Sequence, residues 1–182
     1  MSLPFAYVTK ERHKVFLAYY HADDEFYRSS FEKQFSAYYT SKSVDLGEID
    51  TELSTEYIRR LIRRNYLADA SVVIVLAGPN TKYRKHVDWE ISAGLEPYSG
   101  RSGLLGVLLP EFPVVGGRYD TDHLPPRLAD NVISGYANVC TWAEIDGNPN
   151  RLTEYVNRSF AMRVQQDLVR NSRVQMARNT GP

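Results

Sequence analysis

Few residues of this chain have types and spacing that suit chemistry, and what is missing excludes several enzyme classes. Cys140 is the only cysteine, and the four histidines, at positions 13, 21, 86 and 123, do not stand at metal-ligand spacing with it or with one another. The sequence contains no GxGxxG, GxxxxGKS/T or GxSxG pattern, so glycine-rich phosphate loops and a serine nucleophile elbow are absent. We therefore expect no bound metal and none of these three site types.

Asp23 and Asp24 are the first candidate carboxylates, because they directly follow the first apolar run of the chain. Receiver domains that accept a phosphoryl group hold magnesium with acidic residues at this place. Their phosphoacceptor aspartate ends the third strand, however, and here the third apolar run ends in Leu76-Ala77-Gly78-Pro79. No lysine closes the fifth run either, which argues against a working receiver. The ordinary role of both aspartates is to complement the positive end of a helix dipole.

Glu90 is the second candidate carboxylate, and it stands beside Trp89 in the middle of a predicted helix. Val87, Ile91 and Leu95 mark one apolar side of that helix. A glutamate in such a position is ordinarily a solvated residue on the outer side of a helix. Spacing alone therefore does not identify Glu90 as a catalyst.

Short apolar runs predict the strands that must position these carboxylates. In chain order the predicted strands cover residues 14–20, 43–46, 71–76, 103–109 and 137–142. Such runs are typical of parallel strands that are buried on both faces of a sheet. The run 71–76 is rich in β-branched residues and ends at Gly78-Pro79, so we expect it at the centre of the sheet.

Helical patterns alternate with these strands. Apolar and small residues at helical spacing are Phe26, Ser30, Phe31, Phe35 and Tyr38 after the first strand, Leu53, Tyr57, Ile58, Leu61 and Ile62 after the second, and Leu152, Tyr155, Val156, Phe160 and Val164 near the end. This alternation predicts an α/β fold, a flavodoxin-like three-layer sandwich with a parallel five-stranded sheet.

The predicted organisation is a single domain over residues 1–182. Its core covers about residues 14–142, and its C-terminal helix covers about residues 149–172 and then frays before Pro182. In open sheets of this kind the ligand crevice lies beyond the carboxyl ends of the strands. Residues 19–24, 45–50 and 77–90 are therefore expected to border that crevice.

Composition and charge restrict the partners of this domain. Its 43% apolar and 24% charged residues are typical of a globular protein, and 22 Lys plus Arg balance 22 Asp plus Glu. No net charge attracts nucleic acid or anionic lipid, so neither is expected as a partner. A single cysteine and the lack of any membrane-length apolar stretch or signal peptide predict a cytoplasmic location.

Several segments together resemble TIR domains. Residues 15–21 followed by Asp23-Asp24 are similar to the opening strand and loop of that family, and residues 83–91 resemble the helix that bears its catalytic glutamate. Val44-Asp45 and residues 71–76 match the second and third strands. The resemblance is strongest to the TIR-like subunit of the bacterial Thoeris antiphage system, whose equivalent helix also has an aromatic-Glu-Ile step.

The sequence departs from the TIR pattern at two positions. Ala18 replaces the usual serine before the tyrosine, and His86 stands where TIR domains commonly have tryptophan. Either change could alter the substrate or the activity.

This resemblance implies an enzyme, an NAD glycohydrolase or ADP-ribosyl cyclase, with NAD as substrate and no cofactor. Glu90 would be its catalytic carboxylate. Departure of nicotinamide leaves an oxocarbenium-like ribose, which a fixed negative charge stabilises, and nicotinamide leaves as a neutral molecule that needs no acid. The product, linear or cyclic ADP-ribose, would be a signal read by an effector protein.

The residues expected to bind the substrate are Tyr19, Tyr20, His21, Asp45, His86 and Trp89. Aromatic rings among them could stack on nicotinamide or adenine, and the helix start at residues 22–24 offers backbone N–H groups to the pyrophosphate. Packing in the core is the alternative role of His86 and Trp89.

Two other functions fit the same sequence. The domain could be a non-catalytic TIR-like adaptor that acts by self-association, with Glu90 incidental. It could also be another N-glycosidic enzyme, such as a nucleoside deoxyribosyltransferase, which works through one glutamate as well. Assays of NAD cleavage and of other substrates distinguish these functions.

Overall fold

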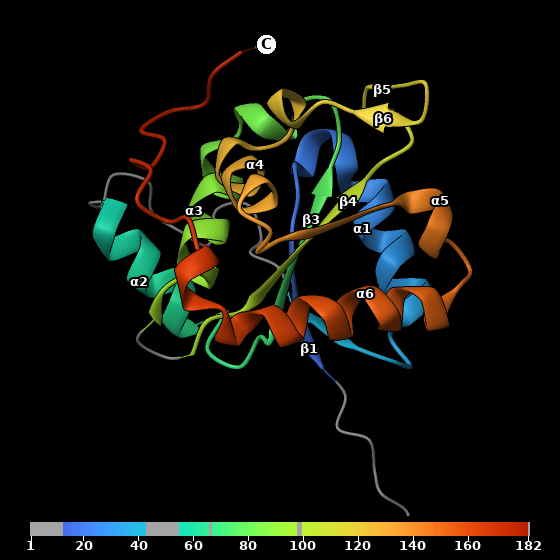
Figure 1. Ribbon diagram of the computed structural model, residues 1–182, viewed down its shortest axis with the longest axis horizontal. Helices are drawn as coiled ribbons and strands as arrows, with labels where there is room; N and C mark the ends of the chain where they lie inside the picture. The colour runs from blue at the N-terminus through green and yellow to red at the C-terminus, as the bar shows by residue number, and fades with distance from the viewer. Residues whose placement is uncertain (1–12, 43–54, 66, 98–99, 182) are drawn as a thin grey trace, which may run out of the picture.

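A parallel sheet forms the centre of the molecule. The computed structural model describes residues 13–42, 55–65, 67–97 and 100–181 (Figure 1). Within this part of the chain, five strands hydrogen-bond in the order β2-β1-β3-β4-β7, and every neighbouring pair is parallel. The strands are β1 (Lys14–Ala18), β2 (Thr40–Lys42), β3 (Val72–Ala77), β4 (Gly103–Leu108) and β7 (Asn138–Thr141).

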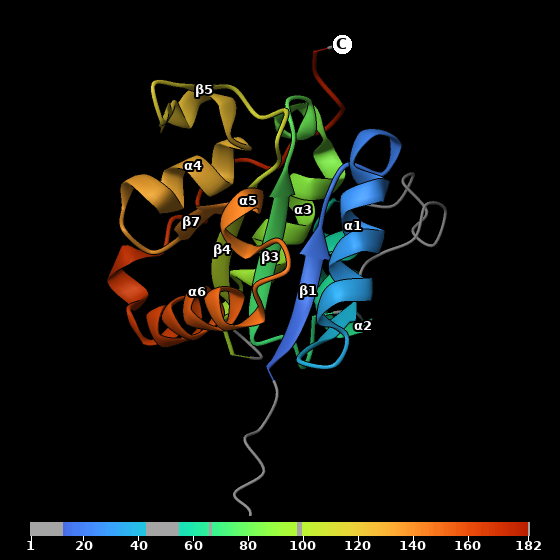
Figure 2. The same cartoon turned by 90° about the vertical axis from the view of Figure 1, so that its right-hand side faces the viewer.

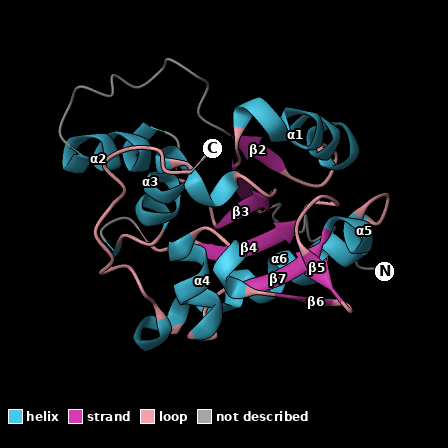
Figure 3. Cartoon of the chain, turned by 90° about the horizontal axis from the view of Figure 1, so that it is seen from above, coloured by secondary structure: helices cyan, strands magenta, loops and turns pink. Residues whose placement is uncertain are grey.

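Helices cover both faces of the sheet. They are α1 (His21–Phe35), α2 (Thr55–Asn65), α3 (Lys85–Gly94), α4 (Pro126–Ile133), α5 (Trp142–Ile145) and α6 (Pro149–Ala161). Seen from above, α2, α3 and α4 lie on one side of the strands, and α1, α5 and α6 lie on the other (Figure 3). The predicted α/β class with a parallel sheet is confirmed, and the strand order is compatible with a flavodoxin-like fold.

Shorter elements connect these helices and strands. The 3₁₀ helix η1 (Thr81–Tyr83) precedes α3, and the antiparallel hairpin of β5 (Val114–Val115) and β6 (Arg118–Tyr119) leads into η3 (Thr121–His123). Two further 3₁₀ turns, η4 (Met162–Val164) and η5 (Gln166–Leu168), follow α6. None of the helices in the described ranges has the length and apolar character needed to cross a membrane.

Strand residues alternate between two cores, one on each face of the sheet. In β1, Phe16 and Ala18 pack with the apolar residues of α2, α3 and α4. Val15 and Leu17 pack with those of α1 and α6. All six residues of β3 are buried, so neither side of this strand faces solvent. The prediction that residues 72–75 lie at the centre of the sheet is therefore confirmed.

The structure corrects the predicted elements in several places. The second strand was expected at residues 43–46, which lie outside the described residues, and the strand beside β1 is residues 40–42. In α1, Phe31 and Phe35 are buried and Phe26 is 73% exposed, whereas Tyr38 lies beyond the end of the helix and is 45% exposed. The buried side of α1 begins with Asp24, whose carboxyl bonds to Thr81 after β3.

Two helices were missed by the reading of the sequence. Helix α4 lies just beyond a segment that reads as a proline- and glycine-rich loop, and its signal is Pro126 at the first helical position. Helix α5 is a single turn with a capping box between Thr141 and Glu144, and it begins at Trp142, the last residue of the predicted fifth strand.

The end of the chain also differs from the prediction. Helix α6 ends at Ala161 instead of continuing to about residue 172, and the exposed Val164 is outside it. The following segment does not fray. It runs past α4 and along α3, where it makes a series of hydrogen bonds (Figure 1).

Gly103 and Gly106 on β4 offer a test of how tightly the sheet packs on its helices. A Cβ atom at Gly103 would overlap the backbone carbonyl of Ser159 in α6, whereas at Gly106 it would meet Leu128 Cδ2 at 3.2 Å. A side chain can turn away and a helix backbone cannot. We expect Gly103→Ala to lower the free energy of unfolding by about 3 kcal/mol and Gly106→Ala by less than about 1 kcal/mol, as measured by urea unfolding. Equal losses would contradict this packing.

Candidate active site

The carboxyl ends of β1 and β3 meet at one edge of the sheet, and the helices that follow them begin there (Figure 2). Helix α1 starts directly after Tyr20, whose carbonyl accepts hydrogen bonds from the backbone N–H groups of Asp23, at 3.2 Å, and Asp24, at 2.8 Å. Helix α3 starts after η1. The candidate residues on both helices are therefore brought to the edge where open α/β sheets bind ligands.

Glu90 lies in the middle of α3 and is 4% exposed. No hydrogen bond or ion pair to its carboxyl comes from the residues that the structure describes. Burial alone raises the pKa of this carboxyl well above its usual value, because the surroundings do not solvate the charge. The ordinary interpretation of Glu90 as a solvated helix residue is therefore wrong.

His86 precedes Glu90 by four residues, so both project from the same side of α3. The His86 ring is tilted toward that of Trp89, with 5.2 Å between the ring centroids. Its pKa is lowered by burial and by the nearby charges of Lys85 and His21. His86 is therefore mainly neutral at pH 7, and His21 at the start of α1 lies near enough to contribute to this shift.

Tyr20 faces the side of the sheet on which α3 lies. The Arg84 guanidinium carbon is 4.0 Å from the centroid of the Tyr20 ring, and Arg84 directly precedes α3. This cation–π contact ties the residue before α1 to the residue before α3.

Tyr19 points to the opposite face of the sheet from Tyr20. It is 3% exposed and belongs to the core between the strands and α1 and α6. Its hydroxyl donates a hydrogen bond to Glu25 Oε2 at 2.9 Å, and its ring lies 4.2 Å from that of His21. Tyr19 therefore packs in the core on the face of the sheet opposite α3, and its place in a crevice with Glu90 stays a prediction.

Trp89 is held by the C-terminal segment of the chain. Its indole N–H donates to the carbonyl of Met176 at 2.9 Å, and the Lys85 ammonium lies 5.0 Å from its ring. With 3% exposure, the indole is a packing residue, which was the alternative to substrate stacking. Asp45, the remaining predicted contact, lies outside the described residues.

Asp24 ties the start of α1 to the loop after β3. Its carboxyl accepts a hydrogen bond from the Thr81 hydroxyl at 2.9 Å, and that hydroxyl accepts one from the Gly78 N–H at 2.8 Å. Beside it, Asp23 accepts a bond from the Asn80 amide at 2.9 Å. Burial raises the pKa of Asp24 to about 6, although the bond from Thr81 works in the other direction.

Asp88 and Arg127 form a buried ion pair that the reading of the sequence missed. Asp88 is 2% exposed and Arg127 is fully buried, with 2.8 Å between Arg127 Nε and Asp88 Oδ1. The two residues lie in α3 and α4, and α4 was not predicted. A charged residue in a loop would carry no signal of burial, so the pair could not be inferred from residue types.

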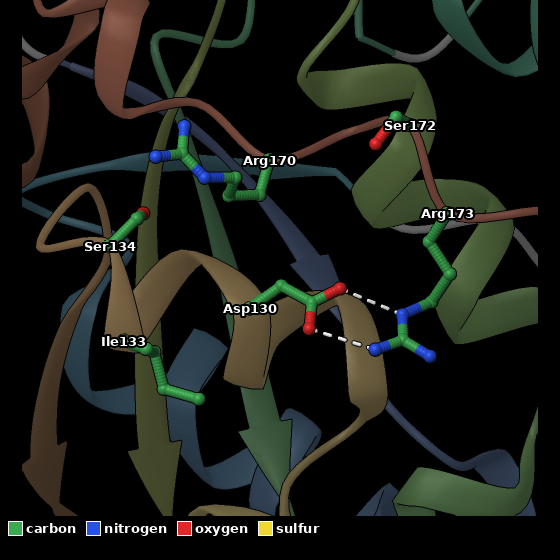
Figure 4. A pocket seen from close by; sticks show the side chains of 6 residues that line it. All are labelled: Asp130, Ile133, Ser134, Arg170, Ser172 and Arg173. Atoms are coloured by element: carbon green, nitrogen blue, oxygen red, sulfur yellow. Dashed lines mark hydrogen bonds and ion pairs between the residues drawn. The ribbon is translucent and has the colours of Figure 1, made fainter.

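Two hollows on the described surface lie away from Glu90. One, of about 630 Å³, lies between α4 and the C-terminal segment (Figure 4) and is lined by Asp130, Ile133, Ser134, Arg170, Ser172 and Arg173. Both carboxylate oxygens of Asp130 accept bonds from Arg173, and Arg170 donates to carbonyls of its own segment. The other, of about 510 Å³, follows the β5–β6 hairpin. Neither contains a predicted site residue.

Within the described part of the molecule, no group of three or more His, Cys, Asp or Glu residues could hold a metal ion. The candidate catalytic group of this site is the buried carboxyl of Glu90.

The fold and the position of the candidate residues define the class of protein, an α/β domain with a parallel sheet and candidate residues beyond its carboxyl edge. Residues 16–112 of the 182 match the family model described as Thoeris protein ThsB, TIR-like domain, which is more than half of the chain. The chain belongs to this family. The matched range includes the last three residues of β1, from Phe16 to Ala18, and all of α1 and α3. No curated protein matches the sequence.

Asp24 gives the fold a predictable dependence on pH. Its pKa of about 6 in the folded protein exceeds the unfolded value of 3.8, so the folded state binds the proton more tightly and loses stability as pH rises from about 4 to about 6. Asp24→Asn keeps an oxygen for the Thr81 bond and has no charge. We expect urea unfolding to show a more stable variant at pH 8 and no gain at pH 4. Asp23→Asn, its exposed neighbour, serves as the control, and a gain of equal size at both pH values would contradict the prediction.

Proposed function

We propose that this protein is a TIR-like signalling enzyme of Thoeris antiphage defence that cleaves the nicotinamide N-glycosidic bond of NAD. Membership of the ThsB TIR-like family supports this function. The observation that carries it is the Glu90 carboxyl, buried on α3 without a hydrogen-bond partner among the described residues. Such a group costs stability, and strongly perturbed carboxyls of this kind gather at functional sites.

The chemistry follows from the charge that Glu90 supplies. The bond between the ribose C1′ and the nicotinamide nitrogen breaks, and its electron pair leaves with nicotinamide, which becomes neutral. Positive charge develops on the ribose, and the Glu90 carboxylate stabilises it in surroundings where water does not weaken the interaction. Water, or a nucleophilic atom of the ADP-ribose itself, then forms the new bond at C1′ and releases linear or cyclic product.

Tyr20, His21 and His86 are the proposed substrate contacts among the described residues. They come from the starts of α1 and α3, which the Tyr20–Arg84 contact joins, and His21 lies near enough to His86 to lower its pKa. Tyr19 supports His21 from the core, since the two rings pack together. The N–H groups of Asp23 and Asp24 already bond to Tyr20, which leaves the first residues of α1 to approach the pyrophosphate. Asp45 remains a proposed contact.

The product is proposed to be a signal, so the partner of this enzyme is an effector protein that binds linear or cyclic ADP-ribose. NAD is its substrate and no cofactor takes part. Self-association does not require a buried carboxyl that has no partner among the described residues, and this burial is the reason to prefer the enzyme.

Glu90→Gln is the decisive variant. The amide keeps the size of the side chain and removes its charge, so nicotinamide release from NAD should fall a hundredfold or more. Because the wild-type charge is costly to bury, the variant should melt at the same temperature or higher at pH 8. Release is followed by mass spectrometry, with the protein alone and with phage-infected lysate.

Tyr83→Phe, in η1 just before α3, is the matched control and should keep full activity. Undiminished turnover in Glu90→Gln would remove Glu90 from the mechanism. If the wild-type protein cleaves neither NAD nor deoxynucleosides in any condition, the adaptor is favoured. Transfer of deoxyribose between bases would favour a deoxyribosyltransferase.

The raised pKa of Glu90 predicts how activity depends on pH. Only the ionised carboxylate stabilises the ribose cation, and burial shifts its ionisation to higher pH than is usual for glutamate. We therefore expect kcat/KM for nicotinamide release to rise with pH through this raised pKa. A rate that is already constant above the ordinary pKa of a glutamate, as measured by a pH profile, would contradict the assignment.

A further inference from the structure

The C-terminal segment follows helix α3 along most of its length and runs in the opposite direction. Asn171 donates from Nδ2 to the carbonyl of Ser92 at 3.0 Å, near the end of α3. Further on, the carbonyl of Met176 accepts the indole N–H of Trp89, in the middle of the helix. Thr180 donates to the carbonyl of Tyr83 at 2.9 Å, just before the helix begins. We call residues 171–180 the strap.

The buried ion pair joins the strap to two helices. Arg127 of α4 donates to both carboxylate oxygens of Asp88 in α3, at 2.8 and 3.3 Å. Its other donors reach the Oδ1 of Asn171 at 2.9 Å, the carbonyl of Asn171 at 3.2 Å and the carbonyl of Arg173 at 2.9 Å. Asp88 also accepts the backbone N–H of Met176 at 2.9 Å. A buried guanidinium is stable here because all its donor groups are bonded.

The strap also caps the start of α3. The residue before the helix, Arg84, makes no side-chain capping bond. Instead, the Asn179 side chain accepts a hydrogen bond from the backbone N–H of Lys85, the first helical residue, at 3.0 Å. Backbone N–H groups in the first turn have no partner within the helix, so the strap supplies one from outside.

These contacts lie on the side of α3 away from Glu90. Asp88 and Ser92 are four residues apart and face the strap, and Val87 and Ile91 face the sheet. His86 and Glu90 occupy a third side. Apolar contacts with the sheet hold the helix but are not directional, whereas hydrogen bonds fix how far it is rotated and shifted along its axis.

We propose that the strap, with Asp88 and Arg127, positions Glu90 for catalysis by fixing the rotation and register of α3. This inference rests on the proposed function of Glu90. A catalytic charge must be held within about 0.5 Å of its productive position, and packing against the sheet, α2 and α4 does not by itself fix a helix that closely, because apolar contacts are not directional. Asp88, Arg127 and Asn171 are thus positioning residues, which affect the turnover rate more than the binding of NAD.

The test compares two neighbouring residues of the full chain. Asn171→Ala removes the bonds from the Asn171 side chain to Arg127 and Ser92, whereas the Arg170 side chain bonds only to carbonyls of its own segment. Well below the melting temperature of each variant, we expect Asn171→Ala to lower kcat for nicotinamide release about tenfold or more, with KM changed less than about twofold. Arg170→Ala should keep both constants within about twofold of the wild type.

A second measurement is independent of turnover. The Glu90 carboxyl carbon is titrated by ¹³C NMR and assigned from its loss in Glu90→Gln. Burial is what raises the pKa of this group, so a helix that has moved should give a value closer to that of an ordinary glutamate in Asn171→Ala and not in Arg170→Ala. If the wild type fails to cleave NAD, the proposed function fails, and this titration still decides whether the strap positions Glu90.

Asn179→Ala extends the test to a side chain at the exposed end of the strap. It removes the bond to the Lys85 N–H without disturbing the core, so it carries the test if Asn171→Ala does not fold. We expect it to lower kcat and to shift the Glu90 titration in the same direction. A folded Asn179→Ala or Asn171→Ala with wild-type kcat and an unchanged titration would overturn the inference, and so would equal losses in Arg170→Ala.

Discussion

The ion pair between Asp88 and Arg127 connects parts of the chain that the sequence separates widely. It lies where α3, α4 and the C-terminal strap meet, and both residues are buried, with Arg127 bonded to carbonyls of the strap. A lone buried charge would cost several kcal/mol, so each of the three parts requires the other two to be in place. The helix that carries Glu90 is thereby held by the sheet on one side and by polar contacts on another.

The carboxyl of Glu90, on the same helix as Asp88, has the opposite kind of environment. Glu90 and Asp88 are two residues apart on one helix and both are buried, but Asp88 is bonded to an arginine and a backbone N–H, whereas burial alone acts on Glu90. Pairing stabilises a carboxylate and makes it chemically inert, and isolation in apolar surroundings keeps its field available for a substrate cation. The two residues therefore illustrate how environment separates a structural carboxylate from a candidate catalyst.

Much of the layout could be predicted from local patterns. The apolar runs at 14–20, 71–76, 103–109 and 137–142 all contain strands, and the positions of α1, α2 and α3 follow from their helical spacing. The pattern failed at the start of α1, where helical spacing places Asp24 on the same side as Phe31 and Phe35 and leaves Phe26 exposed on the other side.

The sequence by itself determined the α/β class, the central place of residues 72–75 and the helix on which Glu90 lies, since these follow from periodicity and from apolar content along a short stretch. Only the tertiary structure decided that Glu90 is buried, that Trp89 is a packing residue and that the last residues form a strap instead of a fraying helix. Burial and hydrogen bonding depend on segments distant in the chain, such as Met176 against Trp89, and no local pattern encodes which distant segment will cover a given side chain.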